Sequence, residues 1–342
     1  MDGHVEGAAP LDAAIKAAFE AEVAERAGNL FAELLAPAPV PGSASADAGA
    51  AARRFAVLLA RVAFMDPEMA IPVLDIAADD WLAARAAEGM GEAGQRLPRD
   101  EEATRAALAA LSRPGVWLPG LAARFWETVE DVAGASDPGL ITARCAAYGD
   151  AFTPAHFRRL DQAVLRHPGL PAAIAAGPRP RIALADIAGR PEGSLGWHLH
   201  RMIVDNGFDL EVIDTDQFAH LEADYPALHL TSRRILQTHD IWHIVGDFRL
   251  SALGEVGISG FQFAQFGQNY SAGFLATVAA LALHRLPPFL VPLVQVIAEG
   301  WRHGRLTPPL MPVVWEEMWS LPLDEVRRIT GASPFRSAIP DA

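Results

Sequence analysis

Apolar residues along this chain recur mainly at the spacing of amphipathic helices, and strict alternation of apolar and polar positions is almost absent. Strong helix formers dominate the composition. The chain is therefore predicted to be an all-α protein. Its most clearly marked helices cover residues 11–35, 51–64, 67–88, 121–132 and 154–166.

Stretches rich in Pro, Gly and Ser separate these helices. Residues 167–181 contain four prolines and are expected to be irregular. The stretch FDLEVID at 208–214 is the only candidate strand. The turn PEGSLG at 191–196 is expected to start a helix. No internal repeat is visible.

An N-terminal helix and a linker make up residues 1–50. Residues 89–150 differ from the segments around them, because loops separate their helical stretches. They hold no cluster of metal-ligand residues, so we expect them to lie away from any metal site.

The stretch THDIWHIVGDFRLSALGEVG, residues 238–257, concentrates groups that can bind a metal. On a helix His239 and His243 lie about 40° apart and one turn above each other, so both imidazoles can face one ion. Asp240 lies on their flank, about 60° from His243. It is a third ligand or an acceptor that orients a histidine.

Glu255 can join this group only if the chain turns, because a continuous helix would place it about 18 Å away. Gly246 and Asp247 offer a helix end, and Ser251 offers an N-cap for a second helix. Glu255 would then occupy the first turn of that helix, where the helix dipole favours a carboxylate. The predicted ligand set is His239, Asp240, His243 and Glu255.

Two neutral imidazoles and two carboxylates balance a divalent cation, and mixed nitrogen and oxygen ligands suit zinc, cobalt, iron or manganese better than magnesium. Zinc is the first choice. Two other metal hydrolase classes share parts of the pattern. A zinc protease has H-E-x-x-H, but Asp240 has a shorter reach than glutamate. A phosphohydrolase with an H-D pair needs further ligands, for which His229 and Asp247 are available but close in sequence.

The segment after Glu255 has glycines at every third position and then three phenylalanines. These residues form either a tightly packed core or an apolar slot beside the metal. Two basic clusters also have two possible roles. Each could bind an anionic head group or form ion pairs with Glu316 and Glu317. The residues concerned are Gly254, Gly257, Gly260, Phe261, Phe263, Phe266, Arg233, Arg234, Arg302, His303 and Arg305.

Charge and composition exclude several classes of function. The formal net charge of −14 argues against nucleic-acid binding and against a general electrostatic hold on anionic lipid. The single cysteine, Cys145, allows no intramolecular disulfide and no cysteine-based metal site. Prolines and charges interrupt the most apolar region, 273–299, so no membrane-spanning helix is expected. These features predict a cytoplasmic protein that touches apolar material.

Several segments together resemble the Coq4 ("Coq-four") family of coenzyme Q biosynthesis proteins. The signature H-D-x-x-H, eleven residues and then Glu is similar to the metal motif of that family. Four other segments are similar to family segments in the same order. They are residues 52–76, 158–170, 190–203 and 300–331, the last with the element W-E-x-x-W. Residues 1–50 and 89–150 have no recognised counterpart. The resemblance therefore implies a single multi-helix domain over residues 51–335, with a helical insertion at about 89–150 and a tail at 336–342.

The resemblance implies an all-α fold and one divalent metal on the four ligands named above. It implies a polyprenylated hydroxybenzoate as substrate, whose C1 carboxyl is removed in a lyase reaction, with hydroxylation at that carbon as a further step. Asp240 would shuttle the proton. The substrate would contact Phe261, Phe263, Phe266, Arg234 and Arg302.

The resemblance also implies partners among the other ubiquinone-biosynthesis enzymes, peripheral contact with the inner membrane and a homodimer. The alternative is a prenyl-lipid-binding scaffold that performs no chemistry and has a structural metal.

Overall fold

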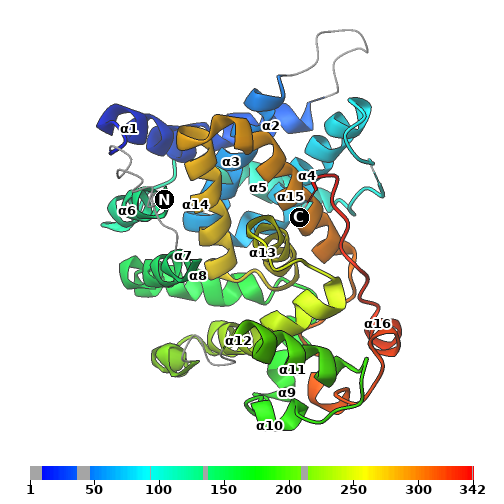
Figure 1. Cartoon of the computed structure of the whole chain (residues 1–342). Helices are drawn as coiled ribbons and strands as arrows, with labels where there is room; N and C mark the ends of the chain where they lie inside the picture. Colours follow the sequence, from blue (N-terminus) through cyan, green and yellow to red (C-terminus); the bar gives the residue numbers. More distant parts are fainter. Residues whose placement is uncertain (1–9, 37–46, 93, 134–137, 209–214, 341) are drawn as a thin grey trace, which may run out of the picture.

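A computed structural model describes residues 10–36, 47–92, 94–133, 138–208, 215–340 and 342. Within these ranges every regular element is a helix, which confirms the all-α prediction (Figure 1). The only strand-like pairing among them is one isolated bridge between Ser194 and Pro322. Residues 37–46 of the predicted linker and residues 209–214 of the candidate strand lie outside the described residues, and α3 already begins at Ala48 within the predicted linker.

The described residues of the first half of the chain contribute eight α-helices. A π-helical stretch, Glu22–Arg26, joins the first two of them, and a short 3-10 turn, Pro67–Met69, precedes the fourth. The α-helices are α1 Ala13–Ala21, α2 Ala27–Leu35, α3 Ala48–Phe64, α4 Ala70–Ala87, α5 Glu101–Leu111, α6 Leu121–Ala133, α7 Pro138–Ala146 and α8 Pro154–Val164.

The second half contributes eight more. Short 3-10 segments, Thr215–Leu221 and Trp315–Glu317, lie before α12 and α16. The α-helices are α9 Leu170–Ala176, α10 Leu184–Ile187, α11 Leu195–Asn206, α12 Pro226–Gly246, α13 Ala252–Phe266, α14 Asn269–Arg285, α15 Pro287–Leu306 and α16 Leu323–Thr330.

Helix α13 occupies the centre of the fold and packs along α15 (Figure 1). Glycines make this close approach possible. A Cβ atom at Gly300 would lie 2.3 Å from the carbonyl oxygen of Gly257, and one at Gly304 would lie 2.6 Å from that of Phe261. A Cβ at Gly260 would lie 2.9 Å from the carbonyl oxygen of Ile297. The glycine spacing therefore serves helix packing rather than ligand access.

The N-terminal helices and the segment 94–133 pack into the same apolar core as α3 and α14. Buried aromatic rings join them. Phe19 lies 6.2 Å from Phe125 between ring centroids, and Phe64 lies 5.4 Å from Phe125. Such pairs add to the stabilisation that area burial provides. These segments thus complete the core instead of forming separate units.

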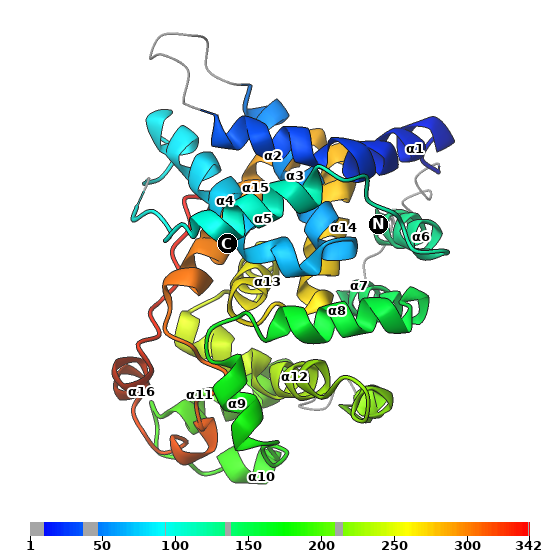
Figure 2. The same ribbon diagram turned by 180° about the vertical axis from the view of Figure 1, so that it is seen from behind.

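Helices α9–α12 and α16 form a second layer around their own apolar cluster (Figure 2). Trp242 of α12 connects the two layers, because its ring stacks on Phe266 of α13 with centroids 4.5 Å apart. Arg327 of α16 donates hydrogen bonds to the carbonyl oxygens of Val245 and Ile244 at the end of α12. The second layer therefore fixes the helix that carries the histidines.

The expectation of an irregular segment over 167–181 is wrong in part, because α9 lies within it. Pro171 occupies the first turn of α9, where its missing N–H breaks no hydrogen bond. Gly169 and Gly177 bracket the helix in conformations with positive φ. None of the helices in the described ranges is both long and apolar enough to cross a bilayer.

Candidate metal centre and adjoining cavity

The chain turns between α12 and α13 as the sequence predicts. Asp247 ends α12 in the left-handed region, with φ 53°, and the backbone N–H of Phe248 donates to the carbonyl oxygen of His243. Ser251 then caps α13, with its hydroxyl accepting from the N–H of Gly254 at 3.0 Å. This turn brings the first residues of α13 alongside the last turn of α12.

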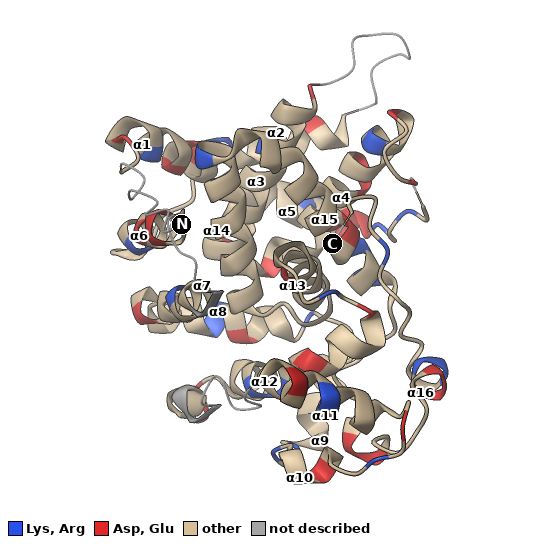
Figure 3. Ribbon diagram, viewed as in Figure 1, with Lys and Arg blue, Asp and Glu red and all other residues tan. Residues whose placement is uncertain are grey.

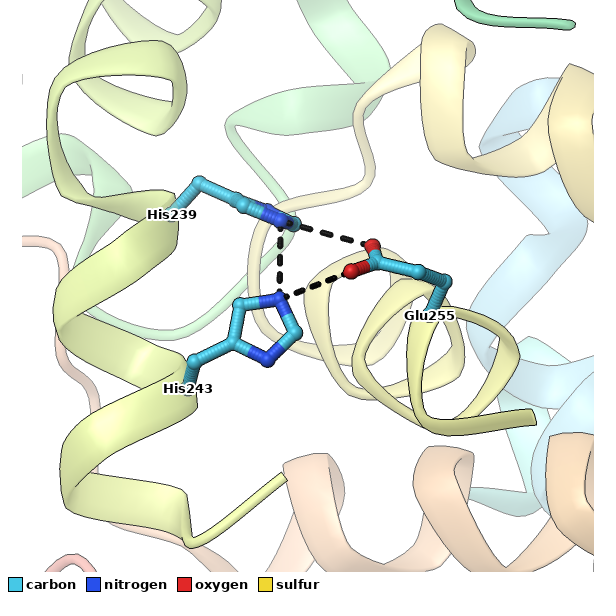
Figure 4. A group of neighbouring side chains, drawn as sticks. All are labelled: His239, His243 and Glu255. Atoms are coloured by element: carbon cyan, nitrogen blue, oxygen red, sulfur yellow. Dashed lines mark hydrogen bonds and ion pairs between the residues drawn. The ribbon is translucent and has the colours of Figure 1, made fainter. Parts of the chain in front are cut away.

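The result is a cluster of two imidazoles and one carboxylate (Figure 4). The Nε2 atoms of His239 and His243 lie 3.1 Å apart. Glu255 Oε1 lies 3.2 Å from Nε2 of His243, and Oε2 lies 3.5 Å from Nε2 of His239. One potential ligand atom from each residue therefore faces a common point, as binding of one ion requires.

His243 is held in the tautomer that metal binding needs. Its side chain is 2% exposed, and its Nδ1 lies 3.1 Å from the carbonyl oxygen of Phe248. That oxygen can only accept, so Nδ1 carries the proton and Nε2 presents its lone pair to the cluster. A backbone acceptor of this kind is the usual support for a metal-binding histidine.

His239 depends on a second pair of residues. Its Nδ1 contacts the side-chain amide of Gln262, and the amide oxygen accepts from the hydroxyl of Ser271 at 3.1 Å. Gln262 and Ser271 are both buried. With the amide turned over, its oxygen accepts from Nδ1–H and its nitrogen donates to Ser271, which frees Nε2 for a metal. Gln262 and Ser271 thus fix the ring of His239 and can form a hydrogen bond with it in either tautomer.

The charges of the three groups support one another. Burial alone would lower the pKa of His239, but a hydrogen bond and the charge of Glu255, with help from Asp240, raise that pKa above its ordinary value. Burial would raise the pKa of Glu255, yet its contacts with His239 and His243 hold that pKa well below the ordinary range. A fixed carboxylate between two imidazoles is a donor set that fits a divalent transition metal.

Asp240 stands apart from this cluster of three. It lies on the flank of α12, is half-buried, and shares a cavity wall with His239 and Glu255. The extra residues that a phosphohydrolase would need are elsewhere. Asp247 pairs with Arg336 at 3.1 Å, and His229 lines a different cavity.

A cavity of about 770 Å³ adjoins the cluster, and most of its wall is apolar. Helices α12 and α13 contribute the polar end, with His239, Asp240 and Glu255. Helix α14, whose only charged residue is the terminal Arg285, forms a long apolar side (Figure 3). Other wall residues are Val256, Tyr270, Phe274, Val278, Leu281 and Leu293.

The three phenylalanines that we expected in this wall do not line it. Phe261 packs against Phe248 at 5.5 Å, and Phe263 packs against Trp301 at 5.3 Å, between ring centroids. Phe266 stacks on Trp242, as described above. These rings lie on the faces of α13 that pack against other helices, so that expectation is corrected. Gln262, Tyr270 and Phe274 take their place in the wall.

The two arginines expected to contact substrate are also engaged elsewhere. Arg234 pairs with Glu316 at 2.5 Å and is buried. Arg302 faces Asp79 at 3.7 Å. Neither lines the cavity beside the cluster. Arg234 and Arg302 thus form structural ion pairs.

Part of the predicted insertion reaches this cavity. Val132 of α6 and Ile141 and Thr142 of α7 lie in its wall, opposite the metal-binding helices. No side chain of this segment belongs to the cluster of three. The segment therefore supplies no residue to the cluster of three, although it contributes to the wall of the adjoining cavity.

Comparison with known proteins agrees with this picture. A family model described as "Coenzyme Q (ubiquinone) biosynthesis protein Coq4" matches residues 142–335. Curated "Ubiquinone biosynthesis protein COQ4 homolog, mitochondrial" proteins of Rattus norvegicus and Mus musculus are each 26% identical to the chain, over 161 and 162 residues respectively. Each match covers 46% of this chain, which spans 58% of the length of those relatives.

A solved structure from Nostoc punctiforme, provisionally named a ubiquinone biosynthesis protein, is 23% identical in sequence. The match covers 63% of this chain and 98% of that one, with a TM-score of 0.47.

Proposed function

Because the chain belongs to the coenzyme Q (ubiquinone) biosynthesis protein Coq4 family, we propose that it acts in ubiquinone biosynthesis as a metal-dependent lyase. Its substrate is a polyprenylated hydroxybenzoate, and its reaction removes the carboxyl group at ring carbon C1. The observation that carries this proposal is that the cluster of two histidines and Glu255 opens onto a large apolar cavity.

The exposure of the cluster supports a catalytic rather than a structural site. The side chains of His239 and Glu255 are 29% and 43% exposed, whereas a structural metal site is closed and buried. Three protein ligands leave positions open for a substrate oxygen. We propose that zinc, cobalt, iron or manganese binds there, and when bound it supplies a Lewis acid for the carboxylate or phenolate oxygen.

The remaining steps belong to the chain itself. The apolar wall formed by α14 and α15 holds the prenyl tail and keeps water from the ring, so binding energy from the tail positions the ring at the polar end. Asp240, which lies at that end, delivers a proton to C1. The C1–carboxyl bond then breaks, its electron pair returns to the ring, and carbon dioxide leaves. Hydroxylation at the same carbon would require dioxygen as a further reactant.

The rim of the cavity supports contact with a membrane, from which such a substrate would come. Phe208, Leu286 and Phe289 line the cavity and are 45%, 50% and 57% exposed. Exposed aromatic and aliphatic side chains around an apolar opening favour the interface of a bilayer. We propose peripheral attachment through this rim and, on the basis of family membership, association with other enzymes of the pathway.

The test replaces Glu255 by Gln, which preserves its shape and removes its charge. The variant is produced in a strain that lacks its own copy of the gene, and metal content, folding, ubiquinone and precursors are measured. The lyase proposal expects a folded protein, little ubiquinone and accumulation of the carboxylated polyprenyl precursor. Glu325→Gln, an exposed change on α16, is the matched control and should leave ubiquinone unchanged.

Normal ubiquinone in the folded, metal-free Glu255→Gln variant would reject the lyase. It would favour the alternative, a prenyl-lipid-binding scaffold for the other enzymes of the pathway. Normal ubiquinone in the strain that lacks the gene would reject both.

A further inference from the structure

A second cavity, of about 350 Å³, lies on the other side of α12. Its walls come from α9, from the chain that follows α9, from the first half of α12, and from Met311 and Pro312. The apolar part includes Ile174, Leu230 and Met311, while the polar part includes three arginines and one histidine. This volume is at the small end of the range for ligand sites.

The three arginines differ in how they are satisfied. Arg234 forms a two-point ion pair with Glu316, at 2.5 and 3.1 Å. Arg179 and Arg233 line the same cavity and are half-buried, yet neither has a hydrogen-bond or ion-pair partner among the described residues. The Nε of Arg233 is buried without an acceptor. Two guanidinium groups are thus directed to one small space with their charge uncompensated.

Most of the other buried or half-buried arginines among the described residues form ion pairs. Arg61 contacts Asp66 at 2.5 Å, and Arg305 contacts Asp75 at 3.0 Å. Burying a guanidinium group without a hydrogen-bond acceptor costs free energy. An oxyanion that binds two such groups removes that cost. The chain also carries 42 acidic against 28 basic residues, so unpaired cations are not forced by composition.

The neighbouring titratable groups favour an anion as well. Burial, followed by the charge of Arg233, lowers the pKa of His229, while Glu222 opposes this shift. The imidazole is therefore neutral near pH 7 and can donate one hydrogen bond without adding a charge. Glu222 is the one acidic residue of this wall, and it is exposed.

We propose that this cavity binds a small amphiphilic ligand through an oxyanion head group, a phosphate or a carboxylate, held by Arg179 and Arg233. Guanidinium forks match both head groups, and His229 adds one donor. The apolar wall takes a short organic portion, since the volume is less than half of the 770 Å³ of the cavity beside the metal centre. This site is independent of the metal centre.

The two cavities meet at one residue, Gln237, which lines both. It lies on α12 between the arginines and His239. A ligand in the smaller cavity would therefore contact the helix that carries the histidines, without contacting the metal-binding atoms.

The experiment titrates the purified full chain calorimetrically with inorganic phosphate, inorganic pyrophosphate and 4-hydroxybenzoate as probes. Saturable binding of one equivalent is expected for at least one probe, and the tighter probe assigns the head group as phosphate or carboxylate. Arg233→Gln and Arg179→Gln should each weaken that binding by about tenfold or more. Arg201→Gln, an exposed residue paired with Asp205, is the control and should bind as the wild type does.

His243→Ala separates this proposal from the proposed function, because it should lose the metal and keep the anion. Either arginine variant tests the site, so a folding failure in one leaves the other decisive. Binding of no probe, or equal binding by wild type and both arginine variants, would overturn the proposal. Binding weakened equally in Arg201→Gln would show nonspecific attraction and would also overturn it.

Discussion

The Nε2 of His243 lies 3.2 Å from Oε1 of Glu255, although the two residues belong to different helices. The turn after Asp247 and the cap formed by Ser251 create this contact, and the Phe248 carbonyl fixes the imidazole within it. The geometry thus depends on local hydrogen bonds of the turn, in addition to the packing that places α12 and α13.

Metal binding is the first consequence to test. We expect the purified chain to bind about one equivalent of a divalent transition metal, and His243→Ala to lose it. The control is His200→Ala, a half-buried histidine of α11 that is not part of the cluster. Elemental analysis with a chelator competition measures both. Retention of the metal by His239→Ala combined with His243→Ala would show that the ligand assignment is wrong.

Gln262 should act on the metal through His239. Gln262→Leu removes the group that holds Nδ1, and we expect metal affinity to fall by about 10–100-fold. Gln262→Glu still presents an oxygen to Nδ1–H and should restore most of the affinity. The measurement is a competition titration against a chelating dye at constant pH. Wild-type affinity in the leucine variant would mean that Gln262 only fills space.

The metal-free protein should show a pH window of extra stability. The pKa of His239 is raised from 6.5, so its contribution is complete below pH 6.5 and is lost as pH rises through the folded-state pKa. The pKa of Glu255 is lowered from 4.5, so its contribution is present above pH 4.5 and is lost as pH falls through the folded-state value. Both contributions are complete between pH 4.5 and 6.5.

Urea unfolding with chelator present measures this window. His239→Gln should reduce the free energy of unfolding more at about pH 5.5 than at about pH 8.5. The difference between variants must be used, because burial lowers the pKa of other histidines to about 4, and these histidines destabilise the fold as pH falls from 6.5 towards 4. An equal reduction at both pH values would contradict the ion-pair account.

Local signals in the sequence were enough for most of the helices and for bringing His239, His243 and Glu255 together. The 3.6-residue period marked the helices, and Ser251 together with Asp247 marked the turn that moves Glu255 beside the histidines. These features depend on residues close together in the chain. Helix α9 was not predicted, because the four prolines of its segment are a stronger local signal than its short apolar run.

The cavity wall could not be read in this way. Both faces of α13 are apolar, and which face meets α15 is decided by glycines on two helices far apart in sequence. Phe261, Phe263 and Phe266 therefore appeared to be wall residues and proved to be core residues. Gln262 carried a usable signal, because a glutamine on an otherwise buried helix needs polar partners.

The segment before the family match should help to form the binding cavity for the ligand. Val132→Trp places a large side chain in the cavity wall, and we expect binding of a polyprenylated hydroxybenzoate to fall by about tenfold or more. The control is Val116→Trp in the same segment, since Val116 is 77% exposed. Intrinsic fluorescence titration with the ligand reports affinity. Unchanged affinity in folded Val132→Trp would place the ligand outside this cavity.

Asp240 separates metal binding from catalysis. The three-residue cluster does not include it, yet it lines the cavity beside His239 and Glu255. Asp240→Asn preserves shape and hydrogen bonding but cannot deliver a proton to C1. We therefore expect the variant to fold, to keep about one equivalent of metal, and to release carbon dioxide from the substrate about 100-fold more slowly or worse. Asp205→Asn, an exposed change on α11, is the control. Labelled carboxyl carbon gives the rate directly, and metal analysis of the same sample accompanies it. Loss of metal from Asp240→Asn would instead make Asp240 a fourth ligand, and a wild-type rate would remove it from the mechanism.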